Sequence, residues 1–214
     1  MLKNKLLIAL AIAACSSAVM ADDKIDYSFS VKVWNHKYKE SVYSNNPSGT
    51  KTDNVNANIL SVTARKGDYF VTANALTPTT YSFTNGSNLI RRDTDIALGY
   101  SLNSNISLLV GQKRLGSQLF YIDDESTTKS SLNIGYLGVN GFMSIREDMF
   151  LYGTLTKSYK TSDTTFTGFQ NTEVGFGYVL NNKTQLTVGS RYQKLTSPYG
   201  TNLPGIIVGV NFTP

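Results

Sequence analysis

The sequence predicts an all-β protein, a closed antiparallel up-and-down β-barrel of about ten strands that crosses a membrane, with eight strands as the alternative. Three observations carry this prediction. The charged fraction is low, at 16% of the residues, and the aromatic fraction is high, at 11%. A disordered chain has the opposite composition and is excluded. Beyond the N-terminal segment, no apolar run reaches the roughly 20 residues of a membrane-spanning helix. Apolar residues instead recur at every second position, which is the period of a β-strand with two unlike faces.

The first 21 residues are typical of a secretory signal. Lys3 and Lys5 precede an apolar core, and the segment ends at a small-residue cleavage site that includes Ala21. We therefore expect a signal peptide over residues 1–21 and one barrel domain over residues 22–214. Cleavage leaves 18 Lys and Arg against 15 Asp and Glu, a net charge of +3 without the basic block that would indicate a nucleic-acid partner.

Cys15 is the only cysteine, and it lies inside the signal. A mature chain without thiols has no disulfide and no cysteine-ligated zinc. The residues that end at Cys15, Ile-Ala-Ala-Cys, resemble the lipobox of bacterial lipoproteins. A chain lipidated on Cys15 is therefore the alternative to cleavage after Ala21.

The strands are predicted from alternation and from the spacing of turns. In residues 27–33 the odd positions are apolar and the even ones are polar, and no convincing helical stretch interrupts similar segments along the chain. Short polar turns such as 66–68 and 103–105 alternate with longer loops such as 40–54 and 79–91. The predicted strands are residues 27–38, 56–66, 69–78, 92–102, 106–119, 130–143, 149–159, 170–180, 184–194 and 204–212.

This pattern resembles the small outer-membrane β-barrel proteins of Gram-negative bacteria, over residues 27–212. Strands of roughly 9–12 residues, short turns on one side and long loops on the other are typical of that class. The last segment, which ends at Phe212, resembles the C-terminal signal read by the barrel-insertion machinery, although Thr213 and Pro214 follow it. The resemblance implies an outer-membrane location, with membrane lipid, lipopolysaccharide and the insertion machinery as partners. It points to no particular family, and the oligomeric state stays open.

Aromatic residues are expected in two girdles at the membrane interfaces, where a ring is half buried and a hydroxyl stays wet. The predicted girdle on the turn side contains Tyr27, Phe29, Tyr69, Tyr100, Phe150, Tyr178 and Phe212. The predicted girdle on the loop side contains Trp34, Tyr38, Tyr81, Phe83, Phe120, Tyr121, Tyr159 and Tyr192.

The opposite face of the strands is small and polar, and we expect it to line the barrel interior. Its charged members are Lys32, Arg65, Asp95, Lys113, Glu173 and Arg191, and its glycines are Gly99, Gly111, Gly135, Gly175, Gly177, Gly189 and Gly209. Side chains nearly fill a barrel of eight to ten strands. Two interpretations follow, a plug of ion pairs that holds the barrel shut and a narrow pore that favours anions. Residues 149–159 do not alternate cleanly, so their facing stays open.

Cations at the loop ends of the strands are candidates for contacts with glycolipid phosphates at the outer rim. These candidates are Lys37, Lys39, Arg91 and Arg92.

The sequence shows little sign of catalytic chemistry. His36 is the single histidine, and no phosphate-binding loop, HExxH motif or metal-spaced cluster occurs. We therefore expect no cofactor, no metal and no enzymatic activity, in a barrel that acts as a narrow porin-like channel or as a structural or surface-interaction protein. The alternatives are a soluble periplasmic or lipid-tethered barrel that binds a small ligand, with its apolar face inward, and an outer-membrane lipid-modifying enzyme or protease.

Overall fold

The computed structural model describes residues 24–40, 54–83, 87–120, 126–163, 166–196 and 200–214. The predicted signal over residues 1–21, Cys15 and the predicted girdle residue Tyr121 lie outside these residues. Within them, no helix is long and apolar enough to span a membrane.

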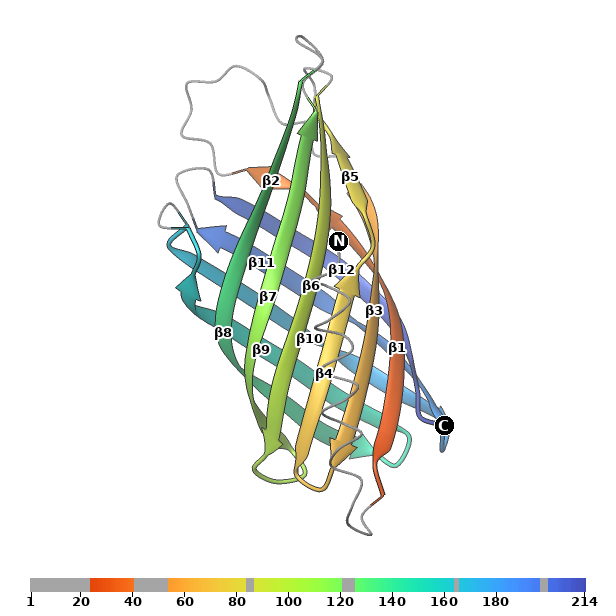
Figure 1. Cartoon of the computed structure of the whole chain (residues 1–214). Helices are drawn as coiled ribbons and strands as arrows, with labels where there is room; N and C mark the ends of the chain where they lie inside the picture. Colours follow the sequence, from red (N-terminus) through yellow and green to blue (C-terminus); the bar gives the residue numbers. More distant parts are fainter. Residues whose placement is uncertain (1–23, 41–53, 84–86, 121–125, 164–165, 197–199) are drawn as a thin grey trace.

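Ten antiparallel strands close into a barrel (Figure 1). Every strand pairs with the next barrel strand along the chain, and the pairing of β1 with β12 closes the circle, which confirms the predicted up-and-down topology. The barrel strands are β1 (Asp26–Lys37), β3 (Asn54–Lys66), β4 (Tyr69–Leu76), β6 (Asn88–Ser101), β7 (Ile106–Phe120), β8 (Thr127–Arg146), β9 (Met149–Thr161), β10 (Gly168–Asn181), β11 (Thr184–Thr196) and β12 (Thr201–Phe212).

Two short strands extend the barrel on the loop side. β2 (Lys39–Glu40) pairs with β12, and β5 (Thr79–Ser82) continues β4 along the edge of β6. The segment predicted as a loop over residues 79–91 is therefore partly strand. β6, β7 and β8 rise with β5 above the rest of the barrel (Figure 1). In this extension the first residues of β8, 127–132, pair with β7 alone among the described strands.

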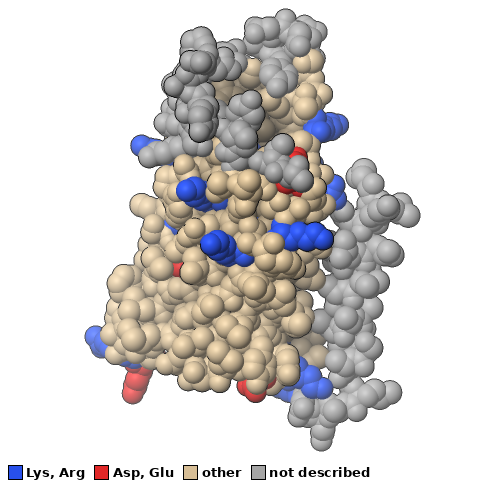
Figure 2. Space-filling model, turned by 90° about the vertical axis from the view of Figure 1, so that its left-hand side faces the viewer, with Lys and Arg blue, Asp and Glu red and all other residues tan. Residues whose placement is uncertain are grey.

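The apolar face of the strands points outward, as predicted. Val31, Val174 and Val208 are each more than half exposed on the outer wall. Figure 2 shows Lys and Arg in the upper part of the molecule and at its lower edge, with a band between them that carries almost no charge. An apolar belt around a barrel without open edges is the arrangement that a bilayer requires. The soluble alternative needs an apolar interior, and this facing contradicts it.

Glycines leave room for rings inside the wall. Phe70 pairs with Gly99, and Phe150 pairs with Gly177 on the neighbouring strand. A Cβ at either glycine would overlap the ring opposite it, so both rings lie flat against the wall. Gly135 differs from its prediction. It faces outward beneath the ring of Tyr159, because Ile134 and Tyr136 on either side of it are buried inside.

Candidate functional site

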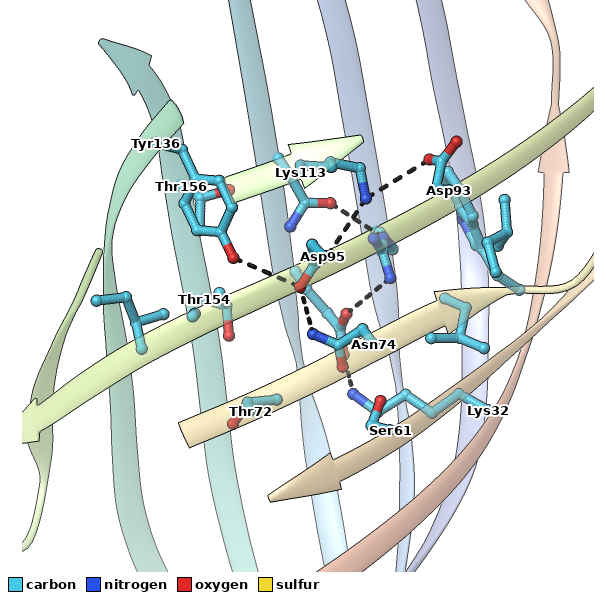
Figure 3. Close-up of a pocket in the computed structure, with 18 of the residues that line it drawn as sticks. Lys32, Ser61, Thr72, Asn74, Asp93, Asp95, Lys113, Tyr136, Thr154 and Thr156 are labelled. Atoms are coloured by element: carbon cyan, nitrogen blue, oxygen red, sulfur yellow. Dashed lines mark hydrogen bonds and ion pairs between the residues drawn. The ribbon is translucent and has the colours of Figure 1, made fainter. Parts of the chain in front are cut away.

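An ion-pair cluster on β6 and β7 occupies the middle of the lumen; we call it the Asp93 cluster. Asp93 Oδ2 lies 2.6 Å from Arg91 Nη2 and 3.5 Å from Lys113 Nζ. Lys113 Nζ also reaches Asp95 Oδ2 at 3.3 Å. Asn74 donates a 2.6 Å hydrogen bond to Asp95, and Figure 3 shows Asp95 between Asn74, Lys113 and a tyrosine on β8. Because their strands alternate in facing, residues two positions apart such as Arg91, Asp93 and Asp95 all enter the lumen.

A second cluster joins β1, β10 and β11, and we call it the Glu173 cluster. Lys32 Nζ lies 2.7 Å from Glu173 Oε1, and Arg191 Nη1 lies 3.7 Å from Glu173 Oε2. Arg191 Nε donates a 3.0 Å hydrogen bond to Asn171 Oδ1. The Arg191 guanidinium also lies 4.8 Å from the centroid of the Trp34 ring, within the range of a cation–π contact. Each buried carboxylate therefore has at least one cation beside it.

One hydrogen bond spans the lumen. Arg91 Nη2 donates to Gln193 Oε1 at 2.7 Å, from β6 to β11. These strands lie on opposite walls, since four barrel strands separate them in either direction around the ring. Gln193 is only 1% exposed. The interior is thus crossed by protein at this level.

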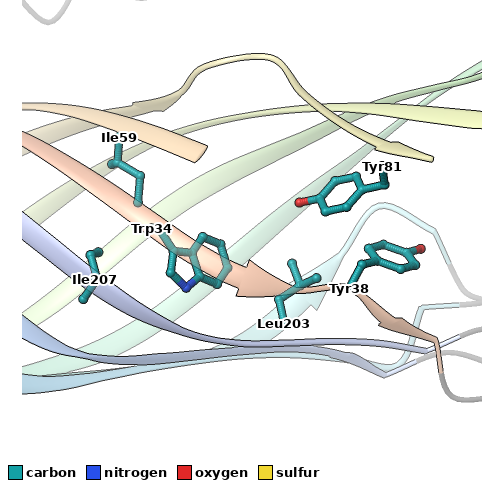
Figure 4. Close-up of a cluster of buried hydrophobic side chains, with 6 residues drawn as sticks. All are labelled: Trp34, Tyr38, Ile59, Tyr81, Leu203 and Ile207. Atoms are coloured by element: carbon teal, nitrogen blue, oxygen red, sulfur yellow. The ribbon is translucent and has the colours of Figure 1, made fainter. Parts of the chain in front are cut away.

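Two apolar clusters fill the lumen toward the loop side. The first contains Trp34, Tyr38, Ile59, Tyr81, Leu203 and Ile207 (Figure 4). The second contains Leu115, Leu132, Ile134 and Phe169. Together with the Asp93 cluster, they leave the outer half of the described lumen packed with side chains.

The turn side of the lumen is hollow. A vestibule of about 610 Å³ is lined by residues of the turn ends, among them Arg65, Phe142 and Tyr152. A smaller central cavity of about 190 Å³ lies beside the two charged clusters. The vestibule and the central cavity share four lining residues, which are Lys32, Thr72, Asn140 and Thr154.

The structure places the six predicted interior charges inside the barrel. Asp95 and Lys113 belong to the Asp93 cluster, and Lys32, Glu173 and Arg191 form the Glu173 cluster. Arg65 lies apart from both clusters, on the wall of the vestibule.

The four cations predicted at the outer rim lie in different places in the structure. Lys37 and Arg92 are exposed on the exterior, and Lys39 lies in β2 with a side chain outside the described part. Arg91 is a correction: it is 7% exposed and holds Asp93 inside the lumen. The physical reason is alternation, because adjacent residues of one strand point to opposite faces, and only Arg92 of this pair can point outward.

Sequence reasoning missed Asp93 and Gln193. In β6 the exposed residues Leu98 and Tyr100 face outward, so the same alternation followed backward along the strand places Asp93 and Arg91 in the lumen. The predicted strand begins at residue 92 and therefore does not include Arg91.

The aromatic girdles need correction as well. The described turn-side residues are exposed as expected except Phe150, which is 5% exposed inside the barrel. On the loop side, Trp34, Tyr38 and Tyr81 are buried in the lumen rather than placed at the membrane interface. Large rings fill the interior at this level, and alternation from Val33 already indicates that Trp34 faces inward.

His36 is buried in this same region. Its Nδ1 lies 3.1 Å from the Trp34 carbonyl oxygen, its Nε2 lies 2.7 Å from Tyr81 Oη, and its ring stacks on the Trp34 indole with centroids 4.0 Å apart. Neither ring nitrogen contacts a serine, threonine or carboxylate side chain of the described residues. No group of three or more His, Cys, Asp or Glu suited to a metal ion occurs among them either.

No protein-family model and no curated protein sequence matches the chain. Solved structures do. The outer membrane protease OmpT of Escherichia coli superposes with a TM-score of 0.57 at 14% identity, over 91% of this chain and 98% of OmpT. Neisserial surface protein A gives 0.46 at 11% identity, over 89% and 99%, and Ail of Yersinia pestis gives 0.44 at 13%, over 88% and 98%. The likeness to OmpT establishes the fold alone: this chain has the fold of an outer-membrane β-barrel protein.

Proposed function

We propose that this protein is a closed, non-catalytic outer-membrane barrel that works through the surface it presents outside the cell. One observation carries the proposal, the Arg91–Gln193 hydrogen bond across the lumen. The apolar clusters on the loop side of this bond are a second barrier. Trp34 and Leu203 are packed there without space for a continuous column of water. The extension formed by β5, β6, β7 and β8 would then be the working surface.

The contacts of His36 support the non-catalytic part of the proposal. A hydrolase needs a nucleophile and a base within hydrogen-bonding reach of each other. The His36 ring instead contacts a backbone carbonyl oxygen and the hydroxyl of Tyr81. The carboxylates of the Asp93 cluster are engaged by Arg91 and Lys113.

Contact with lipopolysaccharide phosphates is the proposed role of the outer cations. Lys37 and Arg92 are exposed on the exterior toward the loop side, and β8, β9 and β11 add more exposed cations at Lys129, Lys157 and Lys194. Cations on the exterior meet phosphate oxygens in charge-assisted hydrogen bonds.

A narrow anion-favouring channel is the second candidate. The vestibule adjoins the central cavity, and the interior carries more cations than carboxylates. For such a channel, the Arg91–Gln193 bond and the apolar clusters would have to move apart.

Planar-bilayer recordings separate the two candidates. We expect folded wild-type protein, checked by its heat-modifiable mobility, to insert without single-channel events. A variant with both Trp34→Ala and Arg91→Ala removes an apolar and a polar barrier together, and we expect it to conduct. Its events would show that insertion is detectable. Discrete anion-selective events from the wild type would overturn the closed barrel in favour of the channel.

A further inference from the structure

Arg65 carries an unneutralised charge within the barrel. Among the interior cations, Lys32, Arg91, Lys113 and Arg191 each pair with a carboxylate. Arg65 forms no ion pair with any carboxylate of the described residues. Two acids lie nearby: Asp26 pairs with Arg65 in the register of β1 and β3, and Asp68 lines the mouth of the same vestibule. Both are exposed, and neither forms an ion pair with Arg65; the Asp26 carboxylate lies 4.0 Å from Lys24 Nζ instead. An anion that enters the vestibule would therefore meet a cation without a partner.

Two contacts hold the Arg65 guanidinium in place. Nη1 donates a 2.8 Å hydrogen bond to Ser101 Oγ, and the group lies 4.7 Å from the centroid of the Phe70 ring. A guanidinium has five N–H donors, so most of them stay available. Its planar donor pattern matches the oxygen pairs of carboxylate and phosphate groups. The position of this cation is thus fixed before an anion arrives.

Aromatic rings supply an apolar surface in the same vestibule. Phe142 is 43% exposed there, and its ring centroid lies 4.9 Å from that of Phe150. Phe150 lies flat over Gly177, which keeps its ring on the wall instead of across the lumen. The vestibule volume of about 610 Å³ falls within the range of small-molecule sites.

We propose that the vestibule binds a small organic anion from the turn side of the barrel. Its carboxylate or phosphate group contacts Arg65, and its apolar part packs on the exposed ring of Phe142, which the buried ring of Phe150 supports. Thr, Ser and Asn side chains on the remaining wall, such as Ser107 and Asn140, offer hydrogen bonds to further polar groups. The site faces the turn side, so it does not depend on whether the lumen conducts.

The test is a binding titration of full-length mature protein in phosphatidylcholine nanodiscs. Phenyl phosphate is the probe, with benzyl alcohol and inorganic phosphate as the neutral and the ring-free comparisons. We expect phenyl phosphate to bind about tenfold more tightly than either, because both halves of the site are used. Calorimetry or ligand-observed NMR gives the dissociation constants, and empty nanodiscs correct for partition into lipid.

Variants assign the binding to this site. Arg65→Gln is expected to weaken phenyl phosphate binding about tenfold, while Arg65→Lys keeps the charge and retains part of the affinity. Phe142→Ala removes an exposed ring with little risk to folding and should weaken phenyl phosphate but not inorganic phosphate. Arg146→Gln is the matched control, since Arg146 is an exposed cation at the same end of the barrel outside the vestibule lining.

Three results would overturn the proposal. The first is wild-type protein that does not bind phenyl phosphate, and the second is equal binding of phenyl phosphate and benzyl alcohol. The third is an Arg65→Gln variant, folded by its mobility, with an unchanged dissociation constant. None of these outcomes bears on bilayer conductance. The binding proposal for the vestibule and the proposal of a closed lumen are therefore tested independently.

Discussion

The guanidinium of Arg91 ties two opposite walls of the barrel together. It donates to Gln193 on β11 at 2.7 Å while its Nε and Nη2 both bind Asp93 on its own strand. A barrel needs only its strand pairs to satisfy the backbone, so this link is an addition to the fold. It fixes the distance between the walls at one level of the lumen, and Asp93 fixes the direction in which Arg91 points.

Asp93→Asn should destabilise the barrel strongly. The substitution leaves the buried Arg91 without a carboxylate partner, while Lys113 keeps Asp95. Breaking a buried ion pair by removing one partner costs about 3–5 kcal/mol. Urea unfolding in phospholipid bilayers measures the change. Asp68→Asn is the control, because Asp68 is exposed at a turn. A loss for Asp93→Asn no larger than that of Asp68→Asn would show that water, not the ion pairs, solvates this part of the lumen.

The interior could be predicted in part, because alternation decides the facing of a strand but not its length. Lys32 and Glu173 lie within regular alternating segments, and both point inward. The prediction does not place Arg91 in the interior, because β6 begins at Asn88, within residues 79–91, which are predicted as a loop. The contact between Lys32 and Glu173 joins residues 141 positions apart, and only the closed barrel brings β1 near β10. A sequence pattern predicts that both side chains face the lumen, but not that they contact each other.

Trp34 shows a different limit. Its place in β1 predicts an inward side chain by alternation, whereas its residue type suggested the membrane interface. The alternation was the better guide, because the strand geometry fixes the direction of every side chain. Arg65 lies inside the barrel, as alternation predicts. Whether its guanidinium has an ion-pair partner depends on where the acidic side chains of the neighbouring strands lie.

Gly177→Ala should lower the stability of the barrel. A Cβ at Gly177 would overlap the Phe150 ring, so the ring must leave the wall. Overpacking of this kind costs about 1–3 kcal/mol. Gly141→Ala is the matched control on β8, since its Cβ would meet nothing within 4 Å. Equal unfolding midpoints in urea for the two variants would contradict the flat placement of Phe150. The same displaced ring should also reduce phenyl phosphate binding in the vestibule.

Val208→Arg tests the membrane-facing wall. Val208 is 52% exposed and has the exposed residues Val33 and Val188 as its neighbours on the adjacent strands. An arginine on the lipid face costs about 2–4 kcal/mol near the bilayer midplane. Asn211→Arg lies on the same strand but lines the vestibule, where water can solvate the charge, so a much smaller loss is expected. Urea titrations of both variants in phosphatidylcholine vesicles compare the two faces directly, and equal losses would contradict the assigned facing.

Arg92→Glu combined with Lys194→Glu tests the proposed glycolipid contact. Both residues are exposed on the exterior, on β6 and β11. Reversing their charges should lower the unfolding free energy by about 1 kcal/mol in bilayers that contain lipopolysaccharide, because favourable pairs with phosphate become repulsive. In phosphatidylcholine alone the change should be close to zero. Lys183→Glu, at an exposed turn on the opposite side, is the control for a charge reversal away from the proposed contact. A loss of the same size in both membranes would mean that these cations stabilise the barrel through protein contacts, and the glycolipid proposal would be wrong.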